Sequence, residues 1–269
     1  MNNIISIEKL SYRYNNDFIF HKLDMNIKQG EWITVVGPNA SGKTTLIKIL
    51  SGLIITDSNI LIDNLFLTKE NLFKVRKNIG VVFEKPDNGF ISETVKEEIS
   101  LVMKNLLYDD KHIEDRIKEI AKIFNIEKIL NCSPNYLSAG EKQKIALACA
   151  IAHNPKIVLL DEALCMLDHY NKTEILEILN KLNKENGLTI LNVTQDLEES
   201  FYSNRLIVIN DGEILLDGPP KQVMLYDKVL NKIGIELPFI VDLSIKLKLY
   251  GLLDEIFFNM DEMVDIIWK

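Results

Sequence analysis

The chain has 269 residues and a formal net charge of −8, because 39 Asp and Glu outnumber 31 Lys and Arg. This acidic balance argues against a broad surface that binds nucleic acid or anionic lipid, so we expect no nucleic-acid partner. If the protein works at a membrane, we expect contacts with other proteins to hold it there. The 47% hydrophobic and 26% charged residues are ordinary for a globular protein, and the length suits one large α/β domain with a small appendage.

Predicted strands and helices alternate along residues 3–210. Short β-branched runs between polar turns predict strands, and apolar residues three and four apart predict helices. In chain order these are strands at 3–10, 18–27 and 31–36, a helix from 43, strands at 60–62 and 79–83, helices from about 93, over 112–124 and from 138, a strand at 156–160, a helix at 170–186, and strands at 188–194 and 205–210. Strands that alternate with helices in this way predict a parallel sheet.

The pattern changes at residues 218–220, which are Gly-Pro-Pro, and we place a domain boundary there. Residues 1–220 form the principal predicted domain and residues 221–269 a C-terminal appendage. Within the appendage a helix is predicted over 224–233. Apolar residues at helical spacing between 240 and 247 favour a second helix, although a period-2 alternation there also fits a strand.

Cysteine use and the apolar runs bear on the cellular compartment. Cys132, Cys149 and Cys165 are scattered without C-x-x-C spacing, which favours reduced thiols over disulfides or zinc. The first residues lack the basic and apolar regions of a secretory leader, and no run approaches the roughly 20 apolar residues of a membrane-spanning helix. We therefore expect a cytoplasmic protein unless a partner recruits it to a membrane.

Residues 37–44, GPNASGKT, fit the pattern G-x-x-x-x-G-K-[ST] of a phosphate-binding loop. The loop follows a predicted strand and opens a predicted helix, so backbone N–H groups and the positive helix end converge on phosphate oxygens. This register disfavours a chance glycine turn. Lys43 is predicted to reach the terminal phosphates of a nucleotide and Thr44 to bind Mg²⁺. The predicted nucleotide contacts of this segment are Gly37, Asn39, Ala40, Ser41, Gly42, Lys43, Thr44 and Thr45.

A second motif, KIVLLDE at residues 156–162, is an apolar strand that ends in two carboxylates. Asp161 is predicted to hold Mg²⁺, through water, and Glu162 to polarise the water that attacks the γ-phosphate. Carboxylates at the carboxyl ends of parallel strands face the crevice where such folds bind ligands. A solvated acidic turn is the alternative, and the phosphate loop upstream makes it the weaker one.

The third motif, LSAGEKQ at residues 137–143, begins a helix with Ser138 and Glu141 in capping-box spacing. One interpretation is a well-capped helix and nothing more. A capped helix start with a serine hydroxyl and a glycine is also a possible phosphate site, and the two interpretations are compatible. Because the motif lies far from the phosphate loop in sequence, it could serve a nucleotide bound to a second subunit.

The three motifs stand in the order and at the spacing of the ATP-binding-cassette (ABC) ATPases, which residues 3–220 resemble. The resemblance implies an α/β P-loop NTPase cassette with a mixed sheet, a helical signature subdomain over about 90–153 and a small C-terminal helical appendage. It also implies a head-to-tail dimer, in which the phosphate loop of one cassette and the signature of the other enclose ATP. The further ATP contacts that it implies are Tyr14 on adenine, with Tyr12 as the other candidate, Ser138, Ala139 and Gly140 at the partner's γ-phosphate, and Asp168 at the dimer interface.

A closer resemblance, to the energy-coupling factor (ECF, CbiO-like) branch, rests on residues 79–88 (IGVVFEKPDN), 137–147 (LSAGEKQKIAL) and 237–244 (LPFIVDLS). It implies an ATPase at the cytoplasmic face of the membrane that powers import of vitamins or of cobalt and nickel ions. The implied partners are a second ABC ATPase, a transmembrane coupling protein (T component) and a substrate-binding membrane protein (S component). Residues 221–269 would then help to hold the ATPase dimer together.

Three other functions compete with this interpretation. An exporter cassette is the nearest, because the core motifs do not separate import from export; the tail and the loop at 83–88 favour import. DNA-repair and translation cassettes carry coiled-coil insertions or two cassettes in one chain, and neither fits 269 residues without a heptad run. A small-molecule kinase would lack the signature at 138–141.

The chain departs from the family pattern at Glu84, Ala139 and Gln195, where Gln, Gly and His are usual, and Ala40 is a milder case. Glu84 keeps an oxygen ligand for Mg²⁺ but loses an amide donor. Gln195 can donate to the γ-phosphate but cannot carry a proton. These departures favour a heterodimer with a better-conforming cassette, and a homodimer stays open. The predicted catalytic residues are Lys43, Glu162 and Gln195, and the predicted metal ligands are Thr44, Glu84 and Asp161.

Overall fold

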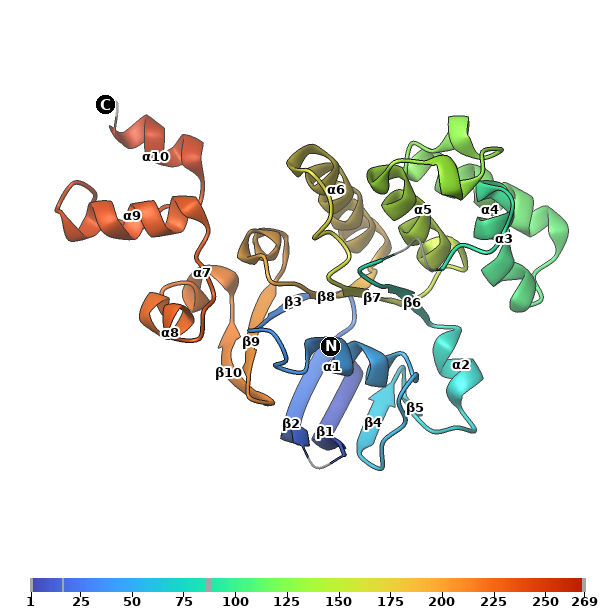
Figure 1. Cartoon of the computed structure of the whole chain (residues 1–269), viewed down its shortest axis with the longest axis horizontal. Coiled ribbons are helices and arrows are strands. Elements are labelled where there is room, and N and C mark those ends of the chain that lie inside the picture. The colour runs from blue at the N-terminus through green and yellow to red at the C-terminus, as the bar shows by residue number, and fades with distance from the viewer. Residues whose placement is uncertain (1, 16, 86–88, 268–269) are drawn as a thin grey trace.

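The computed structural model describes residues 2–15, 17–85 and 89–267, which form two β-sheets with helices around them (Figure 1). The strands are β1 (Asn3–Tyr14), β2 (Asp17–Lys28), β3 (Trp32–Val36), β4 (Asn59–Ile62), β5 (Leu65–Phe66), β6 (Ile79–Val82), β7 (Ile157–Asp161), β8 (Thr189–Val193), β9 (Arg205–Asn210) and β10 (Glu213–Gly218). The helices are α1 (Lys43–Leu50), α2 (Leu72–Arg76), α3 (Val95–Asn105), α4 (Asp110–Ile123), α5 (Ala139–Ala152), α6 (His169–Asn186), α7 (Pro220–Val223), α8 (Asp227–Lys232), α9 (Phe239–Leu249) and α10 (Met260–Ile267), and the 3₁₀ segments are η2 (Glu127–Ile129), η3 (Pro134–Tyr136) and η4 (Leu197–Tyr202).

The larger sheet has six strands in the order β10-β9-β3-β8-β7-β6. Its neighbours pair in parallel except β10, which runs antiparallel to β9, so the sheet is mixed as the fold class predicts. β3, β7 and β8 are buried at every position, which explains why apolar residues predominate in them. β10 is absent from the prediction because it is an edge strand that alternates exposed and half-buried residues.

The smaller sheet has four antiparallel strands in the order β2-β1-β4-β5. β1 and β2 extend beyond the predicted strands because they pair with each other as far as Tyr14 and Asp17. Residue 16, which falls between the two predicted strands, lies outside the described residues. α1 packs between the sheets: its buried apolar residues share one core with those of β1, β2 and β7–β9. This packing brings the start of α1 close to the antiparallel sheet.

The helices α3, α4 and α5 form a separate group beside the edge strand β6 (Figure 1). Two capping boxes set where helices begin: Thr94 with Glu97 at α3, and Ser138 with Glu141 at α5, as predicted for the latter. Apolar residues at helical spacing on α3 and α4 are buried in a core shared with α5, α6 and the larger sheet. The signature therefore lies at the exposed start of a rigidly packed helix.

The C-terminal helices α7 to α10 pack on the β9 side of the larger sheet, on the opposite side of the molecule from α3–α5 (Figure 1). Val223, Leu230 and Val241 are buried against Leu206 and Val208 of β9. α9 is a helix, which confirms the favoured interpretation of the tail. The predicted helix over 224–233 is shorter in the structure, where only α8 falls within that range and α7 precedes it. Within the described residues no helix is both long enough and apolar enough to cross a bilayer.

Candidate functional site

The phosphate loop connects β3 to α1, and the backbone geometry requires its glycines. Gly42 has a φ of 102°, and a Cβ there would lie 2.9 Å from the side chain of Ile19. A Cβ on Gly37 would overlap the carbonyl oxygen of Ile209. Ala40 has a φ of 63°, in the left-handed region that glycine tolerates best. The alanine substitution therefore keeps the loop shape at a cost in backbone strain.

Lys43 begins α1, and its side chain is folded back over the loop. Its Nζ donates hydrogen bonds to the carbonyl oxygens of Gly37 at 2.8 Å and Pro38 at 3.0 Å. Burial lowers the pKa of Lys43, and the charges of Glu162 and Asp161 act in the opposite direction. Among the described residues, the partners of this buried ammonium are carbonyl oxygens. It would gain from contact with an anion, so a phosphate can replace these two acceptors.

Thr44 and Asp161 join the phosphate loop to the end of β7. The Thr44 hydroxyl donates to Asp161 Oδ1 at 3.0 Å. Burial raises the pKa of Asp161, the Thr44 hydrogen bond opposes this, and the charges of Glu162 and Glu84 reinforce it. Carboxylates crowded together in this way favour a cation beside them.

Glu162 follows β7 and is held in an unusual backbone conformation. Its φ is 50°, in the left-handed region that costs a non-glycine residue about 1 kcal/mol or more. Its backbone N–H donates to the Val193 carbonyl at 2.8 Å, and its Oε2 accepts from the backbone N–H of Gln195 at 3.3 Å. These bonds fix Glu162 between the ends of β7 and β8.

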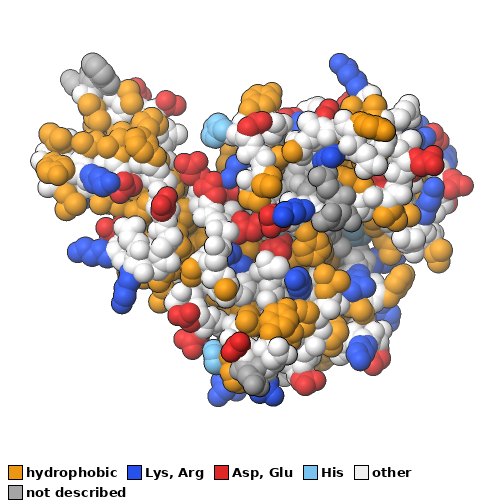
Figure 2. All heavy atoms as spheres, in the orientation of Figure 1, with side chains coloured by type: hydrophobic (Ala, Val, Ile, Leu, Met, Phe, Trp, Pro, Cys, Tyr) orange, Lys and Arg blue, Asp and Glu red, His pale blue; other side chains and the backbone are white. Residues whose placement is uncertain are grey.

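One cavity of about 400 Å³ brings together most of the predicted residues of a single nucleotide site. It is lined by Tyr14, Ile19, Asn39, Ala40, Ser41, Gly42, Lys43, Thr44, Thr45, Glu84, Glu162 and Gln195. Gly37 and Asp161 do not line it but contact Lys43 and Thr44, which do. Figure 2 shows acidic side chains gathered in the central hollow of this face, between the helices above and the antiparallel sheet below.

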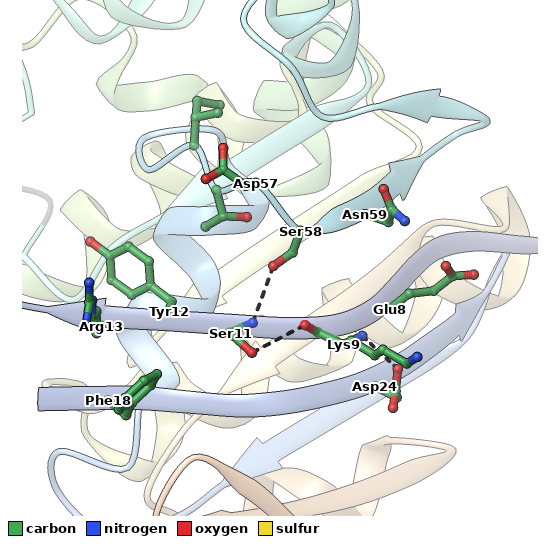
Figure 3. A pocket seen from close by; sticks show the side chains of 12 residues that line it. Glu8, Lys9, Ser11, Tyr12, Arg13, Phe18, Asp24, Asp57, Ser58 and Asn59 are labelled. Atoms are coloured by element: carbon green, nitrogen blue, oxygen red, sulfur yellow. Dashed lines mark hydrogen bonds between the residues drawn. The ribbon is translucent and has the colours of Figure 1, made fainter.

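The structure distinguishes the two tyrosine candidates. Tyr14 lines the cavity of the phosphate loop and is 43% exposed. Tyr12 packs edge-on against Tyr14, with ring centroids 5.0 Å apart, and lines a different cavity of about 880 Å³ (Figure 3). That cavity lies over β1, β2 and residues 55–59 and contains none of the predicted phosphate ligands. Of the two candidates, Tyr14 is therefore the one that lines the same cavity as the phosphate loop.

The signature residues lie apart from the phosphate loop of the same chain. Ser138 and Ala139 are exposed, and Gly140 is buried so closely that a Cβ there would lie 2.9 Å from the Asn171 side chain. Asp168 caps α6 by accepting from the Asn171 backbone N–H at 2.9 Å. None of the predicted residues in this group lines the nucleotide cavity. The exposure of Ser138, Ala139 and Asp168 leaves this group accessible to a second subunit.

Two residues of the site were beyond sequence reasoning. Ile19 lines the cavity from β2, where its apolar side chain next to a polar turn gave no functional signal. The Asn171 side chain packs against Gly140, and the backbone N–H and side-chain amide of Asn171 donate to the two carboxylate oxygens of Asp168. Asn171 lies in the polar first turn of α6, where no sequence pattern distinguishes a functional asparagine from a solvated one.

Comparison with known proteins identifies the fold and the family. The family model described as ABC transporter matches residues 20–165, more than half of the chain. The energy-coupling factor transporter ATP-binding protein EcfA1 of Bacillus subtilis (strain 168) is 36% identical over 272 residues, covering 99% of this chain and 97% of the relative. The chain belongs to the ABC transporter family. EcfA1 of Geobacillus kaustophilus (strain HTA426) is 35% identical over 269 residues, covering 98% of this chain and 96% of the relative.

Solved structures show the same ABC cassette fold. CbiO1 from Clostridium perfringens, described as part of the ABC transporter complex CbiONQ, matches with a TM-score of 0.79 and 31% identity, over 90% of this chain and 99% of that one. The cassette MJ0796, solved as a dimer in a post-hydrolysis state with ADP and Pi, matches with a TM-score of 0.72 and 29% identity, over 80% of this chain and 98% of that one. The predicted fold class and the resemblance to ECF ATPases are thus confirmed, and this ABC cassette is an ATPase that binds ATP.

Proposed function

We propose that the chain is the ATP-hydrolysing subunit of an energy-coupling factor transporter that imports a vitamin or a transition-metal ion through membrane partner subunits. The similarity to EcfA1 proteins supports this, because it extends through the tail and covers 98% to 99% of the chain. The observation that carries the ATPase chemistry is the single cavity that Lys43, Thr44 and Glu162 line together.

ATP binds with its phosphates on the loop and its base at Tyr14. Lys43 exchanges its hydrogen bonds to two loop carbonyls for bonds to phosphate oxygens, which are stronger because both partners are charged. The Ser41 hydroxyl is buried and has no hydrogen-bond partner among the described residues, so it is free to donate to a phosphate. The N–H groups at the start of α1 complete the anion site.

Thr44, Asp161 and Glu84 would hold Mg²⁺, and their chemistry fits the ion. All three supply the hard oxygen ligands that Mg²⁺ prefers, and Asp161 is a buried carboxylate that a cation would stabilise. The described residues contain no group of three His, Cys, Asp or Glu side chains arranged to hold a metal by themselves. This agrees with an ion shared with the ATP phosphates, whose charge it would neutralise when bound.

Glu162 is the residue that polarises the attacking water. Of the residues that the structure describes, Glu162 and Glu84 are the two carboxylates that line the cavity. The backbone of Glu162 is fixed by β8, and its Oε2 is fixed by the backbone N–H of Gln195. Gln195 lies on the same wall and donates its side-chain amide to the γ-phosphate. Because an amide does not titrate, Gln195 adds no positive charge during the reaction. Lys43 therefore neutralises charge at this site, together with the charge that the ion would supply when bound.

A second cassette completes the site, and we propose that it is a different chain. Ser138, Ala139, Gly140 and Asp168 would meet ATP bound to that partner. All four lie apart from their own cavity, and Ser138, Ala139 and Asp168 are exposed. Because Gln195 cannot carry a proton, this chain's own site has less positive charge than the site of a partner with a histidine at that position. Co-expression with candidate cassettes followed by native mass spectrometry tests the choice: a fully active homodimer with the membrane subunits contradicts the heterodimer.

Membrane partners would place the complex at the cytoplasmic face of the membrane, with a T component and an S component above it. The C-terminal appendage would contribute to the pairing of the cassettes. Apolar side chains spread over α9 and α10 (Figure 2), and the exposed ones are Phe239, Leu249, Met260, Val264, Ile266 and Ile267. Replacing Phe239 and Leu249 with serine is expected to weaken pairing while leaving ATP binding to the single cassette intact. No nucleic-acid partner is proposed, because the net charge is −8.

Purification from detergent extracts tests the function. The proposal predicts that a second cassette, a coupling protein and a vitamin- or metal-binding membrane protein co-purify with the tagged chain. An exporter cassette is the alternative, and it predicts co-purification of a transporter that moves its substrate out of the cell. Transport direction in vesicles then separates the two.

A further inference from the structure

We infer that Lys172 is a positioning residue, which holds the Gln195 loop (residues 194–196) against the first turn of α6. The inference rests on the proposed ATPase function and adds one residue to it. Lys172 Nζ lies 2.6 Å from Asp196 Oδ2 and 2.7 Å from Glu199 Oε1. The Lys172 side chain is only 15% exposed, so solvent does not easily replace these partners.

Lys172, Asp196 and Glu199 form an ion cluster, the Lys172 cluster, in which Glu199 is the most firmly held member. Its side chain is 1% exposed, and its Oε2 accepts a hydrogen bond from Asn192 Nδ2 at 2.7 Å. Burial raises the pKa of Glu199, and the charge of Lys172 is the largest influence in the opposite direction. Asn192 lies within the buried strand β8, so the carboxylate is anchored to the centre of the larger sheet. The ammonium is thereby held at a defined position.

Asp196 links Lys172 to the backbone of the Gln195 loop. Its Oδ1 accepts from the backbone N–H of Glu198 at 2.8 Å, and its own N–H donates to Thr194 Oγ1 at 3.1 Å. The next residue back along the chain is Gln195, whose backbone N–H bonds to Glu162 Oε2. Lys172 thus holds the loop on one side of Gln195, while Glu162 contacts it on the other.

The same helical turn also meets the signature. Asp168 caps α6, Asn171 bonds to Asp168, and Gly140 packs on the Asn171 side chain. Lys172 is the next residue of that turn. The geometry of the Gln195 loop is therefore set relative to the element that contacts the signature. An apolar side chain at position 172 could preserve packing, but it could not bridge two carboxylates.

The test compares variants of the full-length chain, in complex with the cassette with which it pairs, by steady-state ATPase kinetics. Lys172→Met is expected to lower kcat at least about tenfold with KM for ATP changed less than about twofold, because a displaced catalytic loop affects turnover more than binding. Lys172→Arg should restore most of kcat, since a guanidinium can bridge both carboxylates. Asp196→Asn should reproduce the loss of kcat, and its side chain is 42% exposed, so the fold tolerates the change.

A double variant separates positioning from simple charge compensation. Lys172→Met leaves Glu199 buried and unpaired, and the added Glu199→Gln removes that charge. The melting temperature should then recover while kcat stays low, because Asp196 still lacks its cation. A double variant with wild-type kcat would overturn the positioning role. So would an Asp196→Asn variant, or a Lys172→Met variant, with wild-type kcat.

Two controls complete the design. Lys144→Met breaks the Lys144–Glu174 ion pair, which matches the Lys172 cluster in length at 2.7 Å and in burial at 13% exposure of the lysine. It is expected to lower the melting temperature without changing kcat more than about twofold. Lys43→Ala identifies the source of the activity: ATPase that survives it contradicts the proposed function. Lys43-dependent ATPase that survives Lys172→Met contradicts only the positioning role.

Discussion

Replacing Ser138 with alanine separates two roles that one hydroxyl is proposed to serve. Within the chain, the Ser138 hydroxyl donates to Glu141 Oε2 at 2.7 Å and accepts from the Glu141 backbone N–H at 3.3 Å, which caps α5. Across the dimer, the same hydroxyl would donate to the γ-phosphate of ATP held by the partner. The first role concerns the stability of one chain, and the second concerns only the ATP-bound pair.

The two roles predict effects of different size. Loss of an N-cap serine costs about 1 kcal/mol, which for a protein of this length lowers the melting temperature by about 2 to 4 °C. Loss of a hydrogen bond to a charged phosphate costs about 1.5–3 kcal/mol, which weakens ATP-driven pairing by roughly 10- to 150-fold for each affected site. ATP binding to the single cassette should not change, because Ser138 does not line its own cavity.

Pairing is measured by analytical ultracentrifugation over a range of ATP concentrations, with Glu162→Gln added to slow hydrolysis. Thr94→Ala is the matched control, because Thr94 and Glu97 form the same capping box at the start of α3, with bonds of 3.2 Å and 3.1 Å. It should lower the melting temperature by a similar amount and leave pairing unchanged. The reasoning is refuted if Ser138→Ala lowers only the melting temperature, or if it weakens ATP binding to the single cassette.

Three further predictions concern the cavity itself. Tyr14→Ala should weaken ATP binding roughly tenfold, since stacking on a base contributes about 1–3 kcal/mol, while Tyr12→Ala should have a much smaller effect; equal effects measured by nucleotide titration would contradict the placement of Tyr14. Gln195→His should preserve or raise the ATPase rate of the assembled complex, and a large loss would show that the site geometry is adapted to glutamine. Burial raises the pKa of Asp161, so the ionised carboxylate destabilises the fold increasingly as the pH rises above about 4, its unfolded value, and fully above its folded pKa. Asp161→Asn should therefore abolish ATPase activity yet raise the melting temperature of the nucleotide-free chain at pH 7 and not at pH 4, and a lower melting temperature at pH 7 would contradict the burial argument.

The sequence predicts a functional site best where the residues of a motif lie in one continuous segment. The phosphate loop, the end of β7 and the start of α5 each combine a recognisable motif with a strand or a helix terminus, and the structure places each of them at such a terminus. The buried strands β3, β7 and β8 are equally clear, because apolar residues predominate in each of them. Peripheral elements are harder to predict from the sequence. β10 and the short helix α2 lack a continuous apolar pattern, and the prediction omits both.

Contacts between distant residues are the part that no sequence pattern predicts. The choice between Tyr12 and Tyr14 depends on where a bulged hairpin directs each ring. The Lys172 cluster joins residues 24 and 27 positions apart along the chain, at charged positions that would ordinarily be solvated. Such pairs form because packing of α6 against η4 excludes water, and this burial is visible only in three dimensions.

Vesicle transport with the co-purified membrane proteins tests the central claim most directly. The proposal predicts that a vitamin or a cobalt or nickel ion moves toward the side that holds ATP and the cassettes, and that Lys43→Ala abolishes this movement by removing charge neutralisation at the phosphates. Transport away from the ATP side, or uptake that Lys43→Ala leaves unchanged, would contradict the account.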